Sequence, residues 1–295
     1  MTGAFSSPGE TVAVARSADP TNPADRRDDR KTRGPERGEG SPWVLRVPDV
    51  SVWWVDLDDA AWPVQHLEAS LSPAERRRAG AFAFPQDRRR FVVRRGILRL
   101  LLSKYLGCLP SSVCFSYGPA GKPELALPAG VTPIRFNCSH SHGLAVQVFA
   151  RGRRVGIDLE AVRHLPEAEA IAAQCFSPRE HSELAGLRGR RLEEAVLRGW
   201  TMKEAYVKAI GEGLGKALEE VEVAAAPGEI PALRAISGDS GTAAKWTLQA
   251  LSPGPGYVAA LVVEGQAYEL SGRTAEETAS DHGLPRRWVA GPGLV

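Results

Sequence analysis

The alternation of apolar and polar residues predicts a chain built from both strands and helices. Apolar positions at helical spacing predict two long helices, over 86–106 and 191–210, each ended by a glycine, Gly107 and Gly211. Short apolar runs bounded by turn residues predict strands over 51–57, 113–117, 134–137, 145–149, 154–160, 246–251 and 257–263. The last two runs flank a Pro-Gly-Pro-Gly turn and are expected to form a hairpin.

Two copies of the pattern Ser-Pro-x-Glu predict helix starts. Ser72-Pro73-Ala74-Glu75 and Ser177-Pro178-Arg179-Glu180 each have a serine cap, a first-turn proline and a glutamate three residues after the cap. The overall order of strands and helices favours an α+β fold over a doubly wound sheet. It allows two halves of similar plan, about 43–152 and 153–265, although the sequence shows no strong residue-level repeat.

Both ends of the chain differ from its middle. Residues 1–42 hold many Asp, Arg, Gly, Pro and Ser and almost no large apolar residues, so we expect a disordered tail. Residues 266–295 are similar and are expected to form a flexible C-terminal tail. The start of the sequence lacks the pattern of a signal peptide.

Composition narrows the class of protein and its compartment. A chain of 295 residues with a net charge of +2 has room for one large domain or two ordinary ones, and this charge does not suggest a nucleic-acid binder. Its four cysteines show no C-x-x-C pairing, which favours reduced thiols. No apolar run approaches membrane-spanning length. We therefore expect a cytoplasmic protein with no membrane partner.

Asp158 and Glu160 lie two residues apart on the predicted strand over 154–160, so their side chains share one face. Two carboxylates on an otherwise apolar strand repel each other, and core packing does not require them. A hard divalent cation such as Mg²⁺ takes oxygen ligands and would explain the pair. The plainer alternative is a strand that ends at a charged turn.

The second long helix carries Trp200, Glu204 and Lys208 at i, i+4 and i+8, along one stripe. An exposed Glu–Lys pair is the simpler interpretation and is worth only about 0.3–0.5 kcal/mol. The tryptophan on the same stripe indicates a partly buried face, where both charges need partners. A metal ion for Glu204 and a phosphate for Lys208 would supply them.

A polar run over 135–142 is expected to end a strand and enter a turn. Its Ser139 and His140 can donate hydrogen bonds to an anionic ligand such as a phosphate. A polar surface turn is the plainer alternative. A zinc site from His140, His142 and Asp158 would need a further good ligand, which no nearby cysteine pair supplies.

Together these motifs resemble those of the Sfp-like 4′-phosphopantetheinyl transferases. The resemblance covers roughly residues 45–265, and the motifs occur in the family's order. They are Gly121-Lys122-Pro123, Phe136-Asn137-Cys138-Ser139-His140-Ser141, Gly156-Ile157-Asp158-Leu159-Glu160, and Trp200 to Lys208 with Gly211-Glu212-Gly213-Leu214. The resemblance implies an α+β pseudo-dimer of two similar halves with the active site in the cleft between them. It further implies a monomer that moves 4′-phosphopantetheine from coenzyme A to a serine of an apo acyl or peptidyl carrier protein and releases 3′,5′-ADP.

The resemblance also assigns roles to residues. Asp158, Glu160 and Glu204 would bind Mg²⁺, with Mn²⁺ as a possible substitute, and Glu204 and Lys208 would be catalytic. The coenzyme A contacts that it implies are Lys122, Pro123, Ser139, His140, Arg90 and Arg78. Glu75 departs from family members that carry a basic residue there. The segment from Arg163 to Arg191 is our candidate surface for an acidic carrier protein.

Two other functions are compatible with parts of the same pattern. A metal-dependent nuclease or phosphohydrolase could use the same carboxylates, but Ala161 and Val162 follow Glu160 where one common nuclease pattern has a lysine. A coenzyme A-binding module that recognises carrier proteins without modifying them is a non-enzymatic alternative. Intact Asp158, Glu160, Glu204 and Lys208 argue against it.

Overall fold

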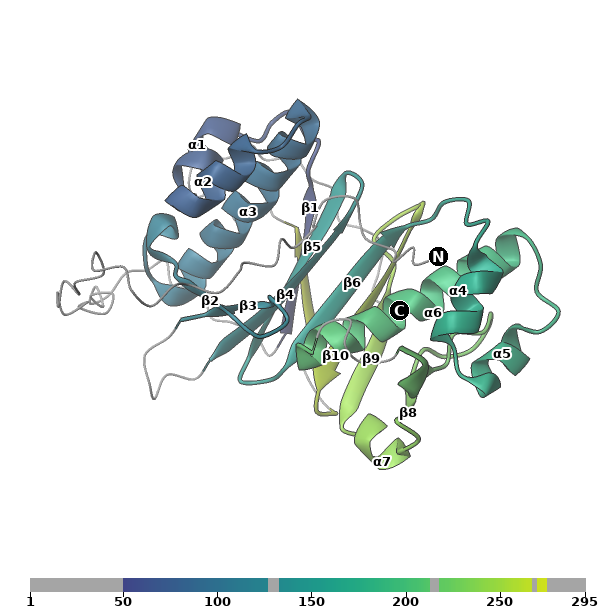
Figure 1. Ribbon diagram of the computed structural model, residues 1–295. Coiled ribbons are helices and arrows are strands. Elements are labelled where there is room, and N and C mark those ends of the chain that lie inside the picture. The colour runs from purple at the N-terminus through teal and green to yellow at the C-terminus, as the bar shows by residue number, and fades with distance from the viewer. Residues whose placement is uncertain (1–49, 127–132, 213–217, 267–269, 275–295) are drawn as a thin grey trace, which may run out of the picture. The chain divides into compact units, whose positions relative to one another are not determined.

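The computed structural model describes residues 50–126, 133–212, 218–266 and 270–274 (Figure 1). The expected N-terminal tail, the predicted start of the folded part near residue 43, and Gly213-Leu214 lie outside these residues. The first half contains β1 (Val50–Asp56), α1 (Val64–Ala69), α2 (Pro73–Gly80), α3 (Pro85–Leu106), the 3-10 turn η1 (Pro110–Ser112), β2 (Phe115–Tyr117), β3 (Pro123–Leu125), β4 (Ile134–Ser141) and β5 (Leu144–Arg151).

The second half repeats this plan of a strand, short helices, a long helix and a closing hairpin. It contains β6 (Val155–Ala161), α4 (Ala168–Cys175), α5 (Pro178–Leu184), α6 (Arg190–Ile210), the 3-10 turn η3 (Leu218–Glu220), β7 (Val221–Val223), β8 (Leu233–Ile236), α7 (Ser240–Ala243), β9 (Trp246–Leu251) and β10 (Tyr257–Glu264), followed by β11 (Leu270–Thr274). The fold is therefore α+β with two similar halves, as predicted.

Each half has its own main sheet. The first is ordered β11-β1-β5-β4, in which only β11 and β1 run parallel, and the second is ordered β6-β10-β9 and is antiparallel. Short hairpins, β2-β3 and β7-β8, accompany them. One apolar cluster contains strand residues of both sheets, among them Val52, Val148, Ile157 and Leu261. This shared cluster fixes the two halves to each other.

The predicted helix signals are confirmed. Ser72 and Ser177 each accept a hydrogen bond from the main-chain N–H of the glutamate three residues on, and each glutamate accepts one from the serine N–H in return. Gly107 and Gly211 end the long helices with φ of 65° and 78°, a conformation that glycine adopts without a steric penalty.

Gly156 allows α6 to lie directly on β6. A Cβ atom at this position would overlap the carbonyl oxygen of Ala205 and the amide nitrogen of Ala209. Figure 1 shows α6 running across the sheet that contains β6. The glycine therefore brings the carboxylates of β6 and the charged stripe of α6 within reach of each other.

Two details of the structure differ from the sequence predictions. The strand predicted over 134–137 is longer than expected, because β4 continues to Ser141, and the polar run over 135–142 enters its turn only at His142, where φ is 52°. Residues 270–274, inside the expected C-terminal tail, form β11 and pair with β1. None of the described helices has the length and apolarity needed to cross a membrane.

Candidate active site

Hydrogen bonds made by side chains connect β4 to β6, whereas main-chain hydrogen bonds connect the strands within each sheet. Asn137, Ser139 and Ser141 alternate along β4 and so face the same way. Asn137 Oδ1 accepts from the Ile157 N–H at 3.0 Å, Ser139 Oγ donates to Asp158 Oδ1 at 2.9 Å, and Ser141 Oγ donates to Glu160 Oε2 at 3.1 Å. These contacts explain why β4 continues through the polar motif.

Lys208 completes a small cluster at the same place. Its Nζ donates to Asp158 Oδ1 at 2.6 Å and to Ser139 Oγ at 3.2 Å, so α6, β6 and β4 meet around one ammonium group. Burial acts to lower the pKa of Lys208, but Asp158 and Glu204 outweigh it and raise that pKa above its usual value. Lys208 is therefore a permanent positive charge beside the carboxylates.

Glu204 lies one helical turn before Lys208 and is 9% exposed. Burial, together with the charges of Asp158 and Glu160, raises the pKa of Glu204 to about 7, although Lys208 opposes the rise. Burial and Asp158 likewise raise the pKa of Glu160. The charge of Asp158 therefore disfavours the ionised forms of both Glu160 and Glu204.

The donor set fits a hard divalent cation. Asp158 Oδ2 and Glu204 Oε1 are buried oxygens that find no hydrogen-bond partner among the described residues, and carboxylate oxygens are the ligands that Mg²⁺ prefers. Within the described ranges, however, no three His, Cys, Asp or Glu side chains are gathered as ligands of one ion. That finding also leaves the alternative zinc site at His140 and His142 without support in this part of the chain.

His140 points away from Ser139, because neighbouring residues on a strand face opposite sides. Burial, reinforced by the charges of Arg94, Lys208, Arg90 and Arg78, lowers the pKa of His140 to about 3. The ring is therefore neutral at neutral pH and surrounded by positive charge. An anion would be well placed here, since it would offset four cations around one imidazole.

The two arginines predicted to contact coenzyme A have different surroundings. Arg90 forms a two-point ion pair with Asp58, with Nε–Oδ1 at 2.8 Å and Nη2–Oδ2 at 2.5 Å. Arg78 is exposed and lies over the ring of Phe91, 5.6 Å from its centroid. Glu75, the noted departure from the family pattern, is a buried member of the α2 capping box. It is thus part of the fold.

Lys122 lies in the turn between β2 and β3 and caps the end of α6. Its Nζ donates to the carbonyl oxygens of Lys208, Ala209 and Val155 at 2.5, 3.3 and 3.4 Å. Burial lowers the pKa of Lys122 to about 8. In this arrangement the lysine holds α6 rather than presenting its ammonium group to a phosphate.

Pro123 and Lys122 help line a cavity of about 130 Å³ between the β2-β3 hairpin, β4 and the end of α6. Phe136, Arg135 and Arg154 also line it. An aromatic ring beside two guanidinium groups suits a flat ligand group that carries a phosphate. Pro123 therefore lies beside a cavity of suitable chemistry, and its contact with coenzyme A stays a prediction.

Sequence reasoning assigned no individual role to Asn137, Ser141 or Arg94. The period of two shared by Asn137, Ser139 and Ser141 was the available signal for the first two. Arg94 lies one helical turn after Arg90 on α3, the spacing at which two helix side chains reach the same spot.

Fold and site together define an α+β protein of two halves with an acidic, lysine-bearing cluster where β4, β6 and α6 meet. Two family profiles match this chain. Residues 154–262 match the 4′-phosphopantetheinyl transferase superfamily, and residues 60–151 match the N-terminal part of 4′-phosphopantetheinyl transferases. The 4′-phosphopantetheinyl transferase HetI of a Nostoc species is 40% identical over 226 residues, which cover 77% of this chain and 92% of that protein.

Other similar proteins are more distant. The L-aminoadipate-semialdehyde dehydrogenase-phosphopantetheinyl transferase of Homo sapiens is 28% identical over 166 residues, 54% of each chain. Among solved structures, the holo-acyl-carrier-protein synthase of Thermotoga maritima is 28% identical with a TM-score of 0.31, covering 38% of this chain and 63% of that one. The assignment rests on the sequence relatives: the chain belongs to the 4′-phosphopantetheinyl transferase superfamily and is an enzyme of that class.

Proposed function

We propose that this enzyme transfers 4′-phosphopantetheine from coenzyme A to a serine of an apo acyl or peptidyl carrier protein and releases 3′,5′-ADP. The observation that carries the proposal is the cluster of Asp158, Glu204 and Lys208, in which two buried carboxylate oxygens have no partner within the described part of the chain and lie beside one ammonium group. Phosphoryl transfer depends on positioning and charge neutralisation, and this cluster provides both.

Asp158, Glu160 and Glu204 would hold Mg²⁺, with Mn²⁺ as a substitute. When bound, the ion would neutralise pyrophosphate charge. The ammonium group of Lys208 stabilises negative charge that develops on the transferred phosphoryl group. Glu204 is also the residue that would accept the proton of the carrier serine.

Coenzyme A would bind with its phosphates near His140, Ser139 and Arg78, and with its adenine near Pro123. The positive charges around His140 support the first contact, and the cavity beside Pro123 supports the second. The exposed side chains of Arg163, Arg179 and Arg188 are in keeping with an acidic carrier docking over 163–191.

The four cysteines are unpaired, which supports a reducing, cytoplasmic setting. Two similar halves within one chain support a monomer, because the fold already joins two such units.

Mass spectrometry of apo carrier proteins incubated with coenzyme A and Mg²⁺ tests the function. We expect the mass of one phosphopantetheine to appear on the carrier, and Asp158→Ala to abolish it while the variant stays folded by circular dichroism. Coenzyme A binding without a mass gain on any carrier would instead identify a binding module. A fully active Asp158→Ala enzyme would exclude the proposed site.

A further inference from the structure

Lys203, next to Glu204 in the sequence, is fully buried, and its ammonium group is fully used inside the protein. Its Nζ donates to Val221 O at 2.6 Å, to Glu180 Oε2 at 2.7 Å and to Leu218 O at 3.1 Å. A lysine ammonium group has three donors and no acceptor. No donor remains for a substrate phosphate, so Lys203 cannot serve the reaction as Lys208 does.

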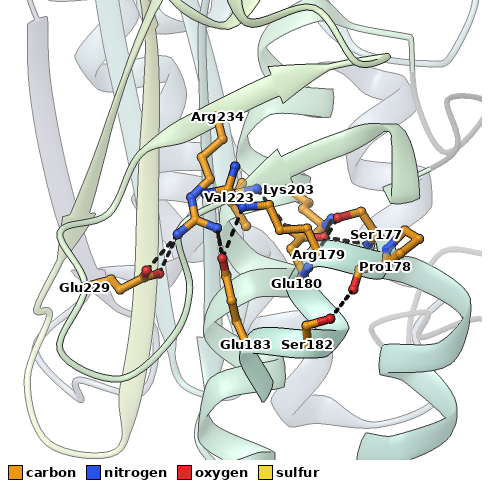
Figure 2. Close-up of polar contacts among 10 residues, drawn as sticks. All are labelled: Ser177, Pro178, Arg179, Glu180, Ser182, Glu183, Lys203, Val223, Glu229 and Arg234. Carbon is orange, nitrogen blue, oxygen red and sulfur yellow. Dashed lines mark hydrogen bonds and ion pairs between the residues drawn. The ribbon is translucent and has the colours of Figure 1, made fainter. Parts of the chain in front are cut away.

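Glu180 is equally occupied. It is 2% exposed and is the glutamate of the α5 capping box, so its Oε2 accepts from the Ser177 N–H at 2.7 Å as well as from Lys203. Its Oε1 accepts from the Val223 N–H at 2.8 Å. Figure 2 shows this carboxylate between Ser177, Lys203 and Val223. One ion pair thus joins the start of α5, the middle of α6 and β7.

The first half contains a similar arrangement, in which Arg95 is a second partner of Glu75. Arg99 on α3 donates from Nε to Glu75 Oε2 at 2.7 Å, and Glu75 is the capping-box glutamate of α2. Its Nη1 donates to the carbonyl oxygens of Pro110 and Val113, at 2.9 and 3.0 Å, in the segment that follows the helix. The acid and the base lie 24 residues apart in this half and 23 apart in the second.

The residue that follows the base differs between the halves. Leu100 follows Arg99 and packs against the apolar core, whereas Glu204 follows Lys203 and belongs to the acidic cluster. The first half therefore has the ion-pair network without the reactive carboxylate. Breaking Arg99–Glu75 removes a similar buried pair, but it leaves α6 untouched.

We propose that Lys203 is a positioning residue that, through Glu180, holds α6 so that Glu204 meets Asp158. Neighbouring residues on a helix point about 100° apart, so Lys203 anchors one side of α6 while Glu204 faces β6. A misplacement of about 1 Å between reacting groups lowers the rate strongly. This positioning role rests on the proposed function in one respect, because it assumes that Glu204 takes part in the transfer reaction.

Lys203→Met and its matched control Arg99→Met test this role. Mn²⁺ binding in the presence of coenzyme A, followed by calorimetry, reports the acidic cluster without turnover. We expect Lys203→Met to weaken Mn²⁺ binding and to lower kcat about 10- to 100-fold, the usual effect of removing a group that orients a ligand residue. Arg99→Met should lower the melting temperature but leave Mn²⁺ binding unchanged.

Lys203→Arg should largely restore both properties, because Arg99 shows that an arginine can bind a capping-box glutamate and two carbonyl oxygens. If Lys203→Met does not fold, the milder substitutions Glu180→Gln in the second half and Glu75→Gln in the first half test the same difference. The positioning role would be overturned if Lys203→Met bound Mn²⁺ as tightly as wild type. It would also be overturned if Lys203→Met and Arg99→Met lost Mn²⁺ affinity equally.

Hydrogen exchange separates this proposal from the proposed function, because it needs neither metal nor substrate. We expect faster exchange over 199–210 and 221–223 in Lys203→Met than in Arg99→Met. Unchanged exchange there would overturn the positioning role even if the enzyme transfers phosphopantetheine. An inactive wild-type enzyme would instead count against the proposed function and leave the exchange result to decide the role of Lys203.

Discussion

Lys208 on α6 and Asp158 on β6, 50 residues apart in the chain, form an ion pair of 2.6 Å at the junction with β4. Asp158 is 4% exposed in its side chain and Lys208 is 30% exposed, so the pair has one buried and one accessible partner. Lys208 can therefore reach a ligand phosphate without leaving its carboxylate. A cation held beside a buried carboxylate is suited to stabilise charge that develops on a phosphoryl group.

Replacing Lys208 by methionine should lower kcat by about 100- to 1000-fold, because it removes the cation that stabilises transition-state charge. Circular dichroism must show that the variant is folded, because the change leaves buried Asp158 without its charged partner. The exposed Lys245→Met is the matched control, and steady-state transfer with a carrier protein is the measurement. Activity of Lys208→Met within a few-fold of that of Lys245→Met would contradict this role.

Gly156→Ala should destabilise the protein by about 1–3 kcal/mol, the usual cost of forcing extra atoms into a packed interior. The new Cβ would overlap main-chain atoms of Ala205 and Ala209, which cannot move without displacing α6. Gly80→Ala is the control, because nothing lies within 4 Å of a Cβ there. Urea unfolding measures the stability of both variants. If Gly156→Ala were as stable as Gly80→Ala, α6 would not pack directly on β6.

Much of this site could be predicted because its signals are local. The pairing of Asp158 with Glu160 follows from the period of a strand, and the stripe of Glu204 and Lys208 follows from the period of a helix. The direction of Lys122 could not be predicted. Whether a lysine in a turn binds a phosphate or a helix end depends on where α6 ends in space, which the β2-β3 sequence does not encode.

Long-range pairing limited the fold prediction in the same way. β11 pairs parallel with β1, and that contact joins the two extremes of the described chain. The continuation of β4 depends on Ser141, whose partner Glu160 lies on another strand. The duplication was also hidden, because Arg99 in one half and Lys203 in the other perform one task with different side chains.

His140 should make stability depend on pH. Its pKa is about 3 in the folded protein and about 6.5 in an unfolded chain, so the unfolded state binds more protons between these values. Stability contributed by neutral His140 is present above about pH 6.5 and is lost as the pH falls, by up to about 1.4 kcal/mol per pH unit.

Urea unfolding of wild type and His140→Gln from about pH 7 to pH 5 measures this effect. Wild type should lose stability relative to the variant as the pH falls. Glu204 changes stability with pH in the opposite direction, because its pKa is raised. Both proteins contain Glu204, so its contribution cancels in the difference between their stabilities. Coenzyme A should reduce the difference, because a bound phosphate favours the protonated ring. Parallel curves would show that His140 is not shielded from protons.

Glu204→Gln should stabilise the metal-free protein and abolish transfer. In the metal-free state Glu204 adds a third carboxylate to a buried cluster, and no described residue donates a hydrogen bond to its Oε1. A neutral amide relieves this repulsion, and each kcal/mol gained would raise the melting temperature by about 2–4 °C. Adding Mg²⁺ with coenzyme A should raise the melting temperature of wild type but not of Glu204→Gln, because a ligand stabilises only the state that binds it. Glu169→Gln, an exposed carboxylate on α4, controls for the loss of one charge and should leave the melting temperature unchanged. A metal-free Glu204→Gln protein that melts below wild type would mean that the glutamate is satisfied within the fold, and the case for a cation at Asp158 and Glu204 would fail.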